Sequence, residues 1–363
     1  MKKIFFSLVA IAALASCSKS EIEYTDQVAI GFVPVSKLST KAAVVDTDYP
    51  DGLNMFVFAN AGLDSDLDAN TVADRVECTD VYLNNAEFTH RNDLDLNVFG
   101  GVTPYYWPNV KSLWFAGVSK SGNVNNGATP SVDFETNVIT VTDYAPGTGS
   151  TTPGDNDLMY FVPVGPYSKA VDGGNSIAVE MKHACSWITV RVVGNGVSGK
   201  ADDPETVADE STTWKVKTLK ITNLALSGDL TVTNGNVAWV EDAADGEFGL
   251  KTATDPVKLT TTPTDLLTAT NAIVIPQAPA TLFVEYEYVS QPAQGTQAAI
   301  VTTESKSIGL EYNNDAEWQP GYHYTYDLLI SAEEILLTPN AAIWTEANGY
   351  EKTENDTDID IND

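Results

Sequence analysis

This 363-residue chain is poor in the side chains from which catalytic and metal sites are usually built. It has three cysteines and three histidines, and no two histidines lie at the spacing of a metal site. It also lacks the short motifs of nucleotide binding, of serine hydrolases and of zinc proteases. Carboxylates are abundant, but no Asp or Glu pair stands out as an acid and base. The sequence therefore predicts neither an enzyme nor a bound cofactor or metal.

Positive charge is scarce as well. Lys and Arg total 20 against 50 Asp and Glu, which gives a formal net charge of −30 at pH 7. A surface this acidic repels phosphate backbones, so we expect no binding to nucleic acid. With 43% hydrophobic residues, the chain still has enough apolar material to form packed cores.

Helical periodicity is a third absence, because no run of about twelve residues repeats its apolar positions at helical spacing. Short runs rich in Val, Ile, Thr, Tyr and Phe recur instead, separated by clusters of Gly, Pro, Asn and Asp. This pattern predicts an all-β protein with about seven or more strands on each side of a turn-rich break at residues 171–175. Since 363 residues exceed the usual size of a single core, we expect two tandem β-sandwich domains.

The N-terminus has the order of charge and hydrophobicity expected of an export signal. Two lysines precede an apolar run at residues 4–14, which is too short to span a bilayer. Leu14-Ala15-Ser16 then precedes Cys17, and this ending resembles the lipobox of bacterial lipoproteins. The resemblance implies that Cys17 carries a lipid and that residues 1–17 form a lipoprotein signal peptide with its lipobox. An ordinary signal peptide with a cysteine at its cleavage site is the alternative.

Two cysteines remain when Cys17 is assigned to lipid. An exported protein can form disulfides, so Cys78 and Cys185 could pair. The alternative is that each is a buried apolar residue, since Cys185 lies within a strand-like run at residues 176–193. The sequence leaves both interpretations open.

Several aromatic and proline-containing segments follow one another in a specific order over most of the chain. They are Ile30-Gly31-Phe32, Thr40-Lys41-Ala42, Tyr105-Tyr106-Trp107-Pro108, Leu113–Val118, Asp157–Tyr160, Met181–Val190, Val274–Gln277, Trp318–Tyr326 and Ile343 with Trp344. In this order and spacing, the chain resembles the fimbrillin family, the pilins of type V pili in Bacteroidota. The resemblance implies two transthyretin-like β-sandwich domains with Greek-key connections, which agrees with the strand count.

On this basis the chain divides into five segments. They are the signal at 1–17, a leading strand and processing segment at 18–45, an N-terminal β-sandwich at 46–172, a C-terminal β-sandwich at 173–345 and an acidic tail at 346–363. The tail could be solvated, or it could add an edge strand, because Thr357, Ile359 and Ile361 would share one face.

The resemblance also implies a mechanism of assembly. In this family a trypsin-like protease removes the leading strand, and a strand from a neighbouring subunit replaces it by β-augmentation. Here Val28, Ile30 and Phe32 would lie on one face of the removable strand, and Lys41 is the candidate processing site. The same strand could equally be a permanent part of the sandwich.

Lys41 departs from the pattern of the best-understood family members, which are cut after arginine. The first arginine of this chain is Arg75, well beyond the leading strand. If Lys41 is not cut, the protein would keep its lipid and act as a basal anchor or as a stand-alone lipoprotein.

The resemblance further implies a donor strand near the C-terminus with alternating bulky apolar residues. The candidate donor residues are Ile335, Leu337, Ile343, Ile359 and Ile361. The last residues of the chain offer only Ile359 and Ile361, which weakens the case for a stalk subunit without removing it.

We therefore expect a structural pilin, as stalk, anchor or tip component, that serves cell adhesion. Its partners would be other pilin subunits through strand addition, the outer membrane through the lipid anchor, and a ligand on a host or bacterial surface. The alternative is a non-polymerising surface lipoprotein that binds carbohydrate or protein. Its candidate platform is Tyr105-Tyr106-Trp107, which requires Trp107 to be exposed.

Overall fold

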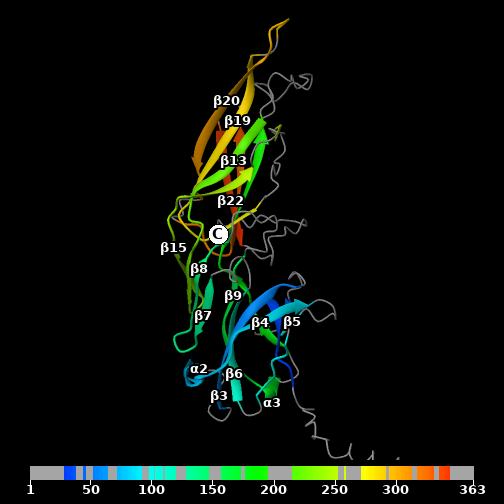
Figure 1. The fold of residues 1–363 in the computed structure, drawn as a ribbon, viewed down its shortest axis with the longest axis vertical. Coiled ribbons are helices and arrows are strands. Elements are labelled where there is room, and N and C mark those ends of the chain that lie inside the picture. The colour runs from blue at the N-terminus through cyan, green and yellow to red at the C-terminus, as the bar shows by residue number, and fades with distance from the viewer. Residues whose placement is uncertain are drawn as a thin grey trace, which may run out of the picture.

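The computed structural model describes residues 28–37, 44–45, 52–63, 72–91, 98–101, 103–108, 111–119, 128–146, 157–172, 176–194, 215–251, 257–258, 271–291, 294–312, 317–330 and 335–343. Cys17, Lys41, Ile359 and Ile361 lie outside these residues. The described chain is almost entirely strand, arranged along an elongated molecule (Figure 1). Its two helices are short, α2 at Val72–Glu77 and α3 at Lys169–Asp172. The prediction of an all-β protein is confirmed.

The largest sheet has nine strands and lies at one end of the molecule (Figure 1). Its main spatial order is β10-β1-β5-β4-β3-β6-β9-β11, and β2 pairs with β1. The strands are β1 (Gly31–Lys37), β2 (Val44–Val45), β3 (Asn54–Leu63), β4 (Asp80–Arg91), β5 (Val98–Gly101), β6 (Lys111–Ser119), β9 (Met159–Ser168), β10 (Ile177–Val179) and β11 (Lys182–His183).

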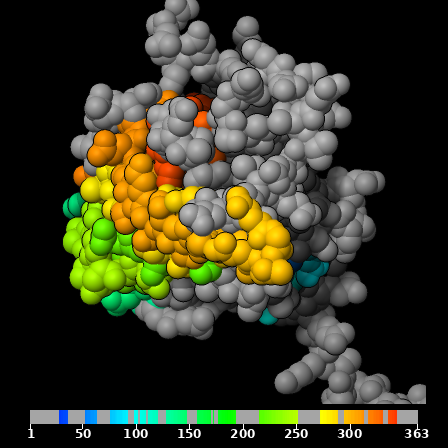
Figure 2. Space-filling model, turned by 90° about the horizontal axis from the view of Figure 1, so that it is seen from above, coloured from blue at the N-terminus to red at the C-terminus, as the bar shows by residue number. Residues whose placement is uncertain are grey.

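Two further sheets face each other at the opposite end. The first has the order β18-β12-β21-β22 and the second the order β16-β13-β19-β20, with β17 beside β13. Their strands are β12 (Ser186–Gly194), β13 (Lys215–Leu224), β16 (Gly246–Lys251), β17 (Val257–Lys258), β18 (Asn271–Val274), β19 (Thr281–Gln291), β20 (Ile300–Gly309), β21 (Tyr322–Ile330) and β22 (Ile335–Ile343). The β19–β20 hairpin extends to the top of Figure 1, and β20 lies at the surface when the molecule is seen from that end (Figure 2).

A fourth sheet joins two hairpins from distant parts of the sequence. It has the order β15-β14-β8-β7. Its strands are β7 (Thr129–Asp133), β8 (Val138–Tyr144), β14 (Gly228–Thr233) and β15 (Asn236–Glu241). We call it the hairpin sheet. Its two turns are linked by a hydrogen bond of 2.8 Å from Asn137 Nδ2 to Asn234 Oδ1.

Strand pairing crosses the expected domain boundary at residue 172. β10 and β11 follow that position in the sequence but pair with β1 and β9 of the nine-stranded sheet. β14 likewise pairs with β8, which precedes the boundary. The division into two sandwich domains remains a prediction, but the two halves of the chain share sheets.

Buried apolar side chains among the described residues form three clusters. The N-terminal core lies within the nine-stranded sheet and includes Ile30, Phe32, Met55, Phe88, Phe115 and Phe161. The middle core lies against the hairpin sheet and includes Phe56, Trp114, Ile139, Leu230, Trp187 and Ile273. The C-terminal core lies between the two facing sheets and includes Ile188, Leu219, Val274, Leu282, Tyr324 and Leu328.

Strands shared between neighbouring cores connect the three clusters. In β3, Met55 and Val57 belong to the N-terminal core, whereas Phe56 and Phe58 belong to the middle core. This follows from the geometry of a strand, in which successive side chains point to opposite faces. β12 and β18 alternate in the same way between the middle and C-terminal cores. Burial on both faces explains why such strands read as continuous apolar runs.

The C-terminal core is held by buried polar bonds as well as by packing. Trp318 Nε1 donates to Tyr326 Oη at 2.9 Å, and Tyr326 Oη donates to the Leu310 carbonyl at 2.9 Å. Gln277 is buried, and its amide bonds both the N–H and the carbonyl of Ala225. Two of the segments that carried the family resemblance therefore have structural roles in the fold.

Candidate functional site

The leading strand β1 occupies an internal position in the nine-stranded sheet. It runs parallel to β10 and antiparallel to β5, with Phe32 opposite Ile177 on one side and Phe99 on the other. The residues just before it continue the pairing, because Ile30 N–H donates to the Tyr105 carbonyl at 2.7 Å. β1 is thus hydrogen-bonded along both edges.

The side chains of this strand fill the N-terminal core. Ile30 is 2% exposed, Phe32 is fully buried and Val35 is 1% exposed. Val28 is partly buried against the same core. The three residues expected on the inner face of the strand all contact one apolar cluster.

Phe32 lies in an aromatic pocket. Its ring meets Phe88 and Phe115 edge to face, with centroids 5.0 Å and 5.2 Å away, and Phe161 lies at 6.0 Å. Edge-to-face pairs add about 0.5–1.5 kcal/mol each beyond the area that they bury. The pocket therefore binds a large apolar side chain at this one position of the strand.

The fimbrillin-like family model matches residues 40–344, which is most of the chain. This chain belongs to the fimbrillin-like family. Residues 1–18 also match the lipid attachment site of prokaryotic membrane lipoproteins. The fimbrillin-like assignment agrees with the resemblance seen in the sequence, and the second match supports a lipid-anchored protein.

Solved structures share the fold at low sequence identity. A fimbrial protein from Bacteroides vulgatus is 14% identical, with a TM-score of 0.52 over 87% of this chain and 99% of its own. A protein from Bacteroides uniformis, to which a role in cell adhesion has been ascribed, is 15% identical, with a TM-score of 0.50 over 88% of this chain and 98% of its own. At this identity the likeness shows the fold alone. No curated protein matches the sequence.

The candidate processing site of this fimbrillin-like chain falls between two paired strands. Lys41 itself lies outside the described residues, but β1 precedes it and β2 follows it. The two strands are antiparallel, with Val35 opposite Val45 and Lys37 opposite Val44. Lys41 is therefore part of the connection between the leading strand and its neighbour.

Arg75 offers no alternative processing site in the folded protein. It is 8% exposed, and its Nε donates to the Phe134 carbonyl at 2.6 Å. Burial lowers the pKa of its guanidinium, and the charge of Asp133 opposes this shift. Arg75 fixes α2 to the hairpin sheet.

Three of the five candidate donor residues lie in β22. This strand ends its sheet and pairs along its whole length with β21, from Tyr322 opposite Ile343 to Ile330 opposite Ile335. Ile335 and Leu337 pack partly buried against the C-terminal core, whereas Ile343 is 62% exposed. As an edge strand, β22 is held from one side only among the described residues.

The structure contradicts the sugar platform. Trp107 is only 4% exposed and packs edge to face on Phe115, with their centroids 6.0 Å apart. Tyr105 stacks on Phe88 at 5.4 Å. Because the proline turn directs these rings into the N-terminal core, Trp107 is not available to stack on a carbohydrate. The segment instead holds the leading strand, since Trp107 N–H donates to the Val28 carbonyl at 2.9 Å.

Cys78 and Cys185 are both buried in the middle core and are not joined by a disulfide. Burial raises the pKa of the Cys185 thiol well above its usual value. A neutral buried thiol packs as a small apolar side chain. The pairing that the sequence allowed is absent from the structure.

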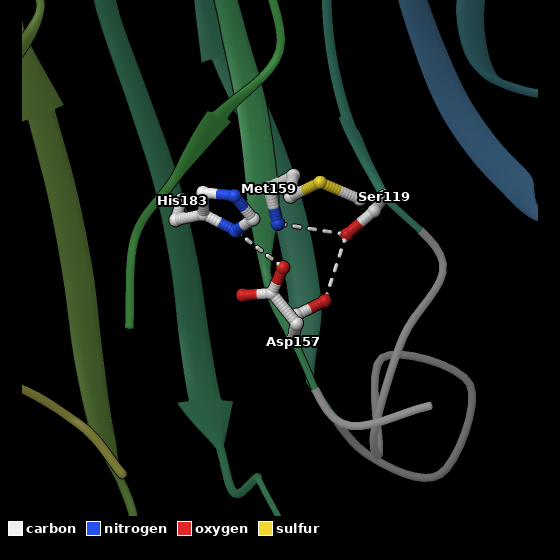
Figure 3. Close-up of polar contacts among 4 residues, drawn as sticks. All are labelled: Ser119, Asp157, Met159 and His183. Carbon is white, nitrogen blue, oxygen red and sulfur yellow. Dashed lines mark hydrogen bonds and ion pairs between the residues drawn. The ribbon is translucent and has the colours of Figure 1, made fainter. Parts of the chain in front are cut away.

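Ser119, Asp157 and His183 come together in a way that resembles a catalytic triad (Figure 3). His183 Nδ1 lies 2.6 Å from Asp157 Oδ2, but Ser119 Oγ donates to the Asp157 carbonyl at 3.2 Å and accepts from Met159 N–H at 2.8 Å. A nucleophile must contact its base, and here the hydroxyl bonds the backbone instead. The cluster links the ends of β6, β9 and β11.

Metal clusters and membrane-spanning helices are both absent from the part of the chain that the structure describes. No group of three or more His, Cys, Asp or Glu residues there could hold a metal ion. No helix among those residues has the length and apolar character needed to span a membrane. The leading strand and its pocket are the feature with the clearest functional chemistry.

Proposed function

We propose that this protein is a structural pilin that assembles by exchange of β1 for a strand of a second subunit, and that the resulting fibre serves cell adhesion. Membership of the fimbrillin-like family supports a fimbrial structural protein. The observation that carries the proposal is the position of β1, an internal strand whose side chains fill a core. The connection from β1 to β2 contains Lys41, and lysine is a residue after which trypsin-like proteases cut.

Removal of β1 would leave two unpaired strand edges and an open apolar pocket. β10 and β5 would each lose a hydrogen-bonded neighbour, and the rings around Phe32 would face water. Burying three side chains such as Val28, Ile30 and Phe32 is worth roughly 5–9 kcal/mol as an upper bound. Such a groove would bind another strand strongly, through main-chain hydrogen bonds and side-chain pockets.

β22 of a second copy is the proposed donor. From Ile30 into β1 the buried residues alternate as Ile30-x-Phe32-x-Pro34, and β22 has Ile335-x-Leu337-x-Pro339. The match ends there, because Val35 is also buried whereas the corresponding Asn340 of β22 is exposed. In β22 the apolar side chains of this pattern are only partly buried, whereas their counterparts in the leading strand are buried. Transfer of β22 into the groove would bury its apolar row more completely, which favours exchange.

The lipid anchor completes the proposal. Lipid on Cys17 would hold the unprocessed chain at the outer membrane, and cleavage after Lys41 would release the remainder for assembly. A subunit that escapes cleavage would stay at the membrane as a basal anchor. The assembled protein would meet a ligand on a host or bacterial surface. A non-polymerising lipoprotein is the remaining alternative, now without a sugar platform at Trp107.

Limited trypsin digestion of the soluble form that begins at Ser18 tests the proposal. We expect cleavage after Lys41, followed by a ladder of oligomers on a gel run in SDS without heating. The Lys41→Gln variant is the matched control, and it should stay monomeric under the same digestion. Cleavage at Lys41 that yields only monomers would reject strand exchange between copies.

A further inference from the structure

Three adjacent strands of the nine-stranded sheet separate the N-terminal core from the middle core. We call β3, β6 and β9 the wall. In β6, Leu113 and Phe115 contact the N-terminal core, whereas Trp114, Ala116 and Val118 contact the middle core. All five are buried, with Trp114 the most exposed at 8%. β6 is therefore buried on both faces along most of its length, whereas in β9 only Met159, Tyr160 and Phe161 are buried.

The leading strand β1 and the two strands that flank it are built differently. β1, β5 and β10 contribute to the N-terminal core alone, through residues such as Phe32, Phe99 and Ile177. Their alternate residues Val33, Gly100 and Ala178 are partly exposed. Loss of β1 would therefore open the N-terminal core on the side away from the middle core.

The hairpin sheet supports the wall from behind. Ile139 and Val141 of β8 and Leu230 and Val232 of β14 are buried in the middle core together with the outer row of the wall. A hydrogen bond of 3.2 Å from Tyr160 Oη to the Gly235 carbonyl also joins β9 to the turn between β14 and β15. None of these contacts involves β1.

We propose that the middle core keeps the acceptor groove formed when β1 is absent. This inference rests on the proposed function, because it concerns the state from which the leading strand has been removed. A sheet with a single core would lose the packing on its one apolar face and collapse. The wall keeps the packing of its second face, so the pocket for the incoming strand stays open and ordered.

The same arrangement gives the hairpin sheet its role. Its two hairpins come from the two halves of the chain, and their pairing closes the middle core only when both halves are folded. The subunit therefore becomes able to accept a strand only after its C-terminal half has folded.

Amide hydrogen exchange on the full chain tests the inference. The double variant Ile30→Asp/Phe32→Asp places two charges in the N-terminal core and should expel β1 without shortening the chain. We expect amides of β5 and β10 to lose protection by at least a hundredfold, whereas amides of the wall stay within about tenfold of wild type. Exchange of the wall at the rate of an unfolded chain would overturn the inference.

Two matched deletions then separate the middle core from general stability. Leu230 lies in the middle core and Leu282 in the C-terminal core, and both are fully buried. Each is changed to alanine in the β1-expelled protein, and binding of a peptide of residues 26–37 is measured. Leu230→Ala should weaken peptide binding at least tenfold, whereas Leu282→Ala should change it less than twofold. Equal effects would overturn the inference.

The smaller deletion Val232→Ala keeps the test valid if Leu230→Ala fails to fold, and a loss of about threefold is expected from it. The proposed strand exchange and the support of the groove by the middle core are rejected by different results. If the wall stays protected but the peptide does not bind, strand exchange is rejected and the support by the middle core stands. If the wall loses protection, the inference is rejected whatever the peptide does.

Discussion

Phe32 of the leading strand and Phe115 of the wall meet edge to face, with their ring centroids 5.2 Å apart and their planes at 82°. This contact joins the strand proposed to leave to the part of the sheet proposed to stay. Phe32 is also the only residue of β1 that is surrounded by three aromatic rings within 6.0 Å among the described contacts. The fit of the leading strand therefore depends most on this one side chain.

Phe32→Ala should lower the free energy of unfolding by about 3–5 kcal/mol, because it leaves a large cavity in a packed core. Denaturant unfolding of the uncleaved protein measures this loss. Phe283→Ala is the control, since Phe283 is partly exposed on the outer side of β19, and it should cost about 1 kcal/mol or less. Similar losses for both variants would show that the pocket does not hold the strand.

Gln277→Ala should destabilise the protein by about 3–5 kcal/mol. The buried amide accepts from Ala225 N–H at 2.7 Å and donates to the carbonyls of Ala225 and Ile275, so its loss leaves buried backbone groups unpaired. Gln319→Ala removes the same side chain at an exposed bond to the Glu317 carbonyl and should cost under about 0.5 kcal/mol. Thermal unfolding compares the stability of the two variants. Equal melting temperatures would contradict the structural role given to the buried Gln277 amide.

His323 should make the protein less stable in acid. Burial, together with the charge of Arg191, lowers its pKa to about 4 from a usual value of 6.5. Between these values the unfolded state binds a proton that the folded state does not, so stability falls as the pH drops from 6.5 to 4. The loss amounts to about 3 kcal/mol at most.

The measurement is the difference in unfolding free energy between wild type and His323→Gln across that pH range. The variant also loses the stacking of the His323 ring on the Trp187 ring, whose centroids are 3.6 Å apart, so its absolute stability will differ. Only the slope with pH tests the prediction, and parallel curves for the two proteins would contradict it.

An arginine-specific protease should leave the bond after Arg75 intact in the folded protein. Arg75 is 8% exposed and hydrogen-bonded to Phe134, whereas Arg91 at the end of β4 is exposed and serves as the internal control. Mass spectrometry of a native digest should find cleavage after Arg91 first, and a digest in urea should find both. Early native cleavage after Arg75 would mean that α2 opens readily.

The sequence predicted the kind of structure better than its connections. Alternating and continuous apolar runs identified the strands, and the segment Leu113–Val118 lies in β6. Only the structure shows that this strand is buried on both faces. The strand-like run at residues 176–193 divides into β10, β11 and β12, which lie in two different sheets. Nothing local in Ile177–Val179 indicates that these residues pair in parallel with β1, because that pairing depends on the rest of the fold.

The middle core was missed for a similar reason. Val141 and Leu230 lie in separate halves of the sequence, and each hairpin looks complete by itself. Their pairing becomes apparent only when the whole sheet is assembled. The aromatic turn at Tyr105-Tyr106-Trp107 was ambiguous, since the same residues suit a surface platform or a core. Burial decided that question in favour of the core.

Disulfide trapping between two copies tests strand exchange most directly. Gly31 of β1 lies opposite Gly100 of β5, and a side chain added at Gly100 meets no atom within 4 Å. If Ile335 of the donor takes the place of Ile30, then Leu336 takes the place of Gly31. A trypsin-cleaved Gly100→Cys subunit should therefore form a disulfide with a Leu336→Cys subunit.

In the control pair, a Val240→Cys subunit takes the place of the Leu336→Cys subunit. Val240 is 70% exposed but lies on β15, outside the proposed donor strand. We predict a covalent dimer of the Gly100→Cys and Leu336→Cys subunits under mild oxidation, formed only after cleavage and at least tenfold more than with the control. Equal yields from both pairs, or no dimer from either, would contradict exchange of β1 for β22.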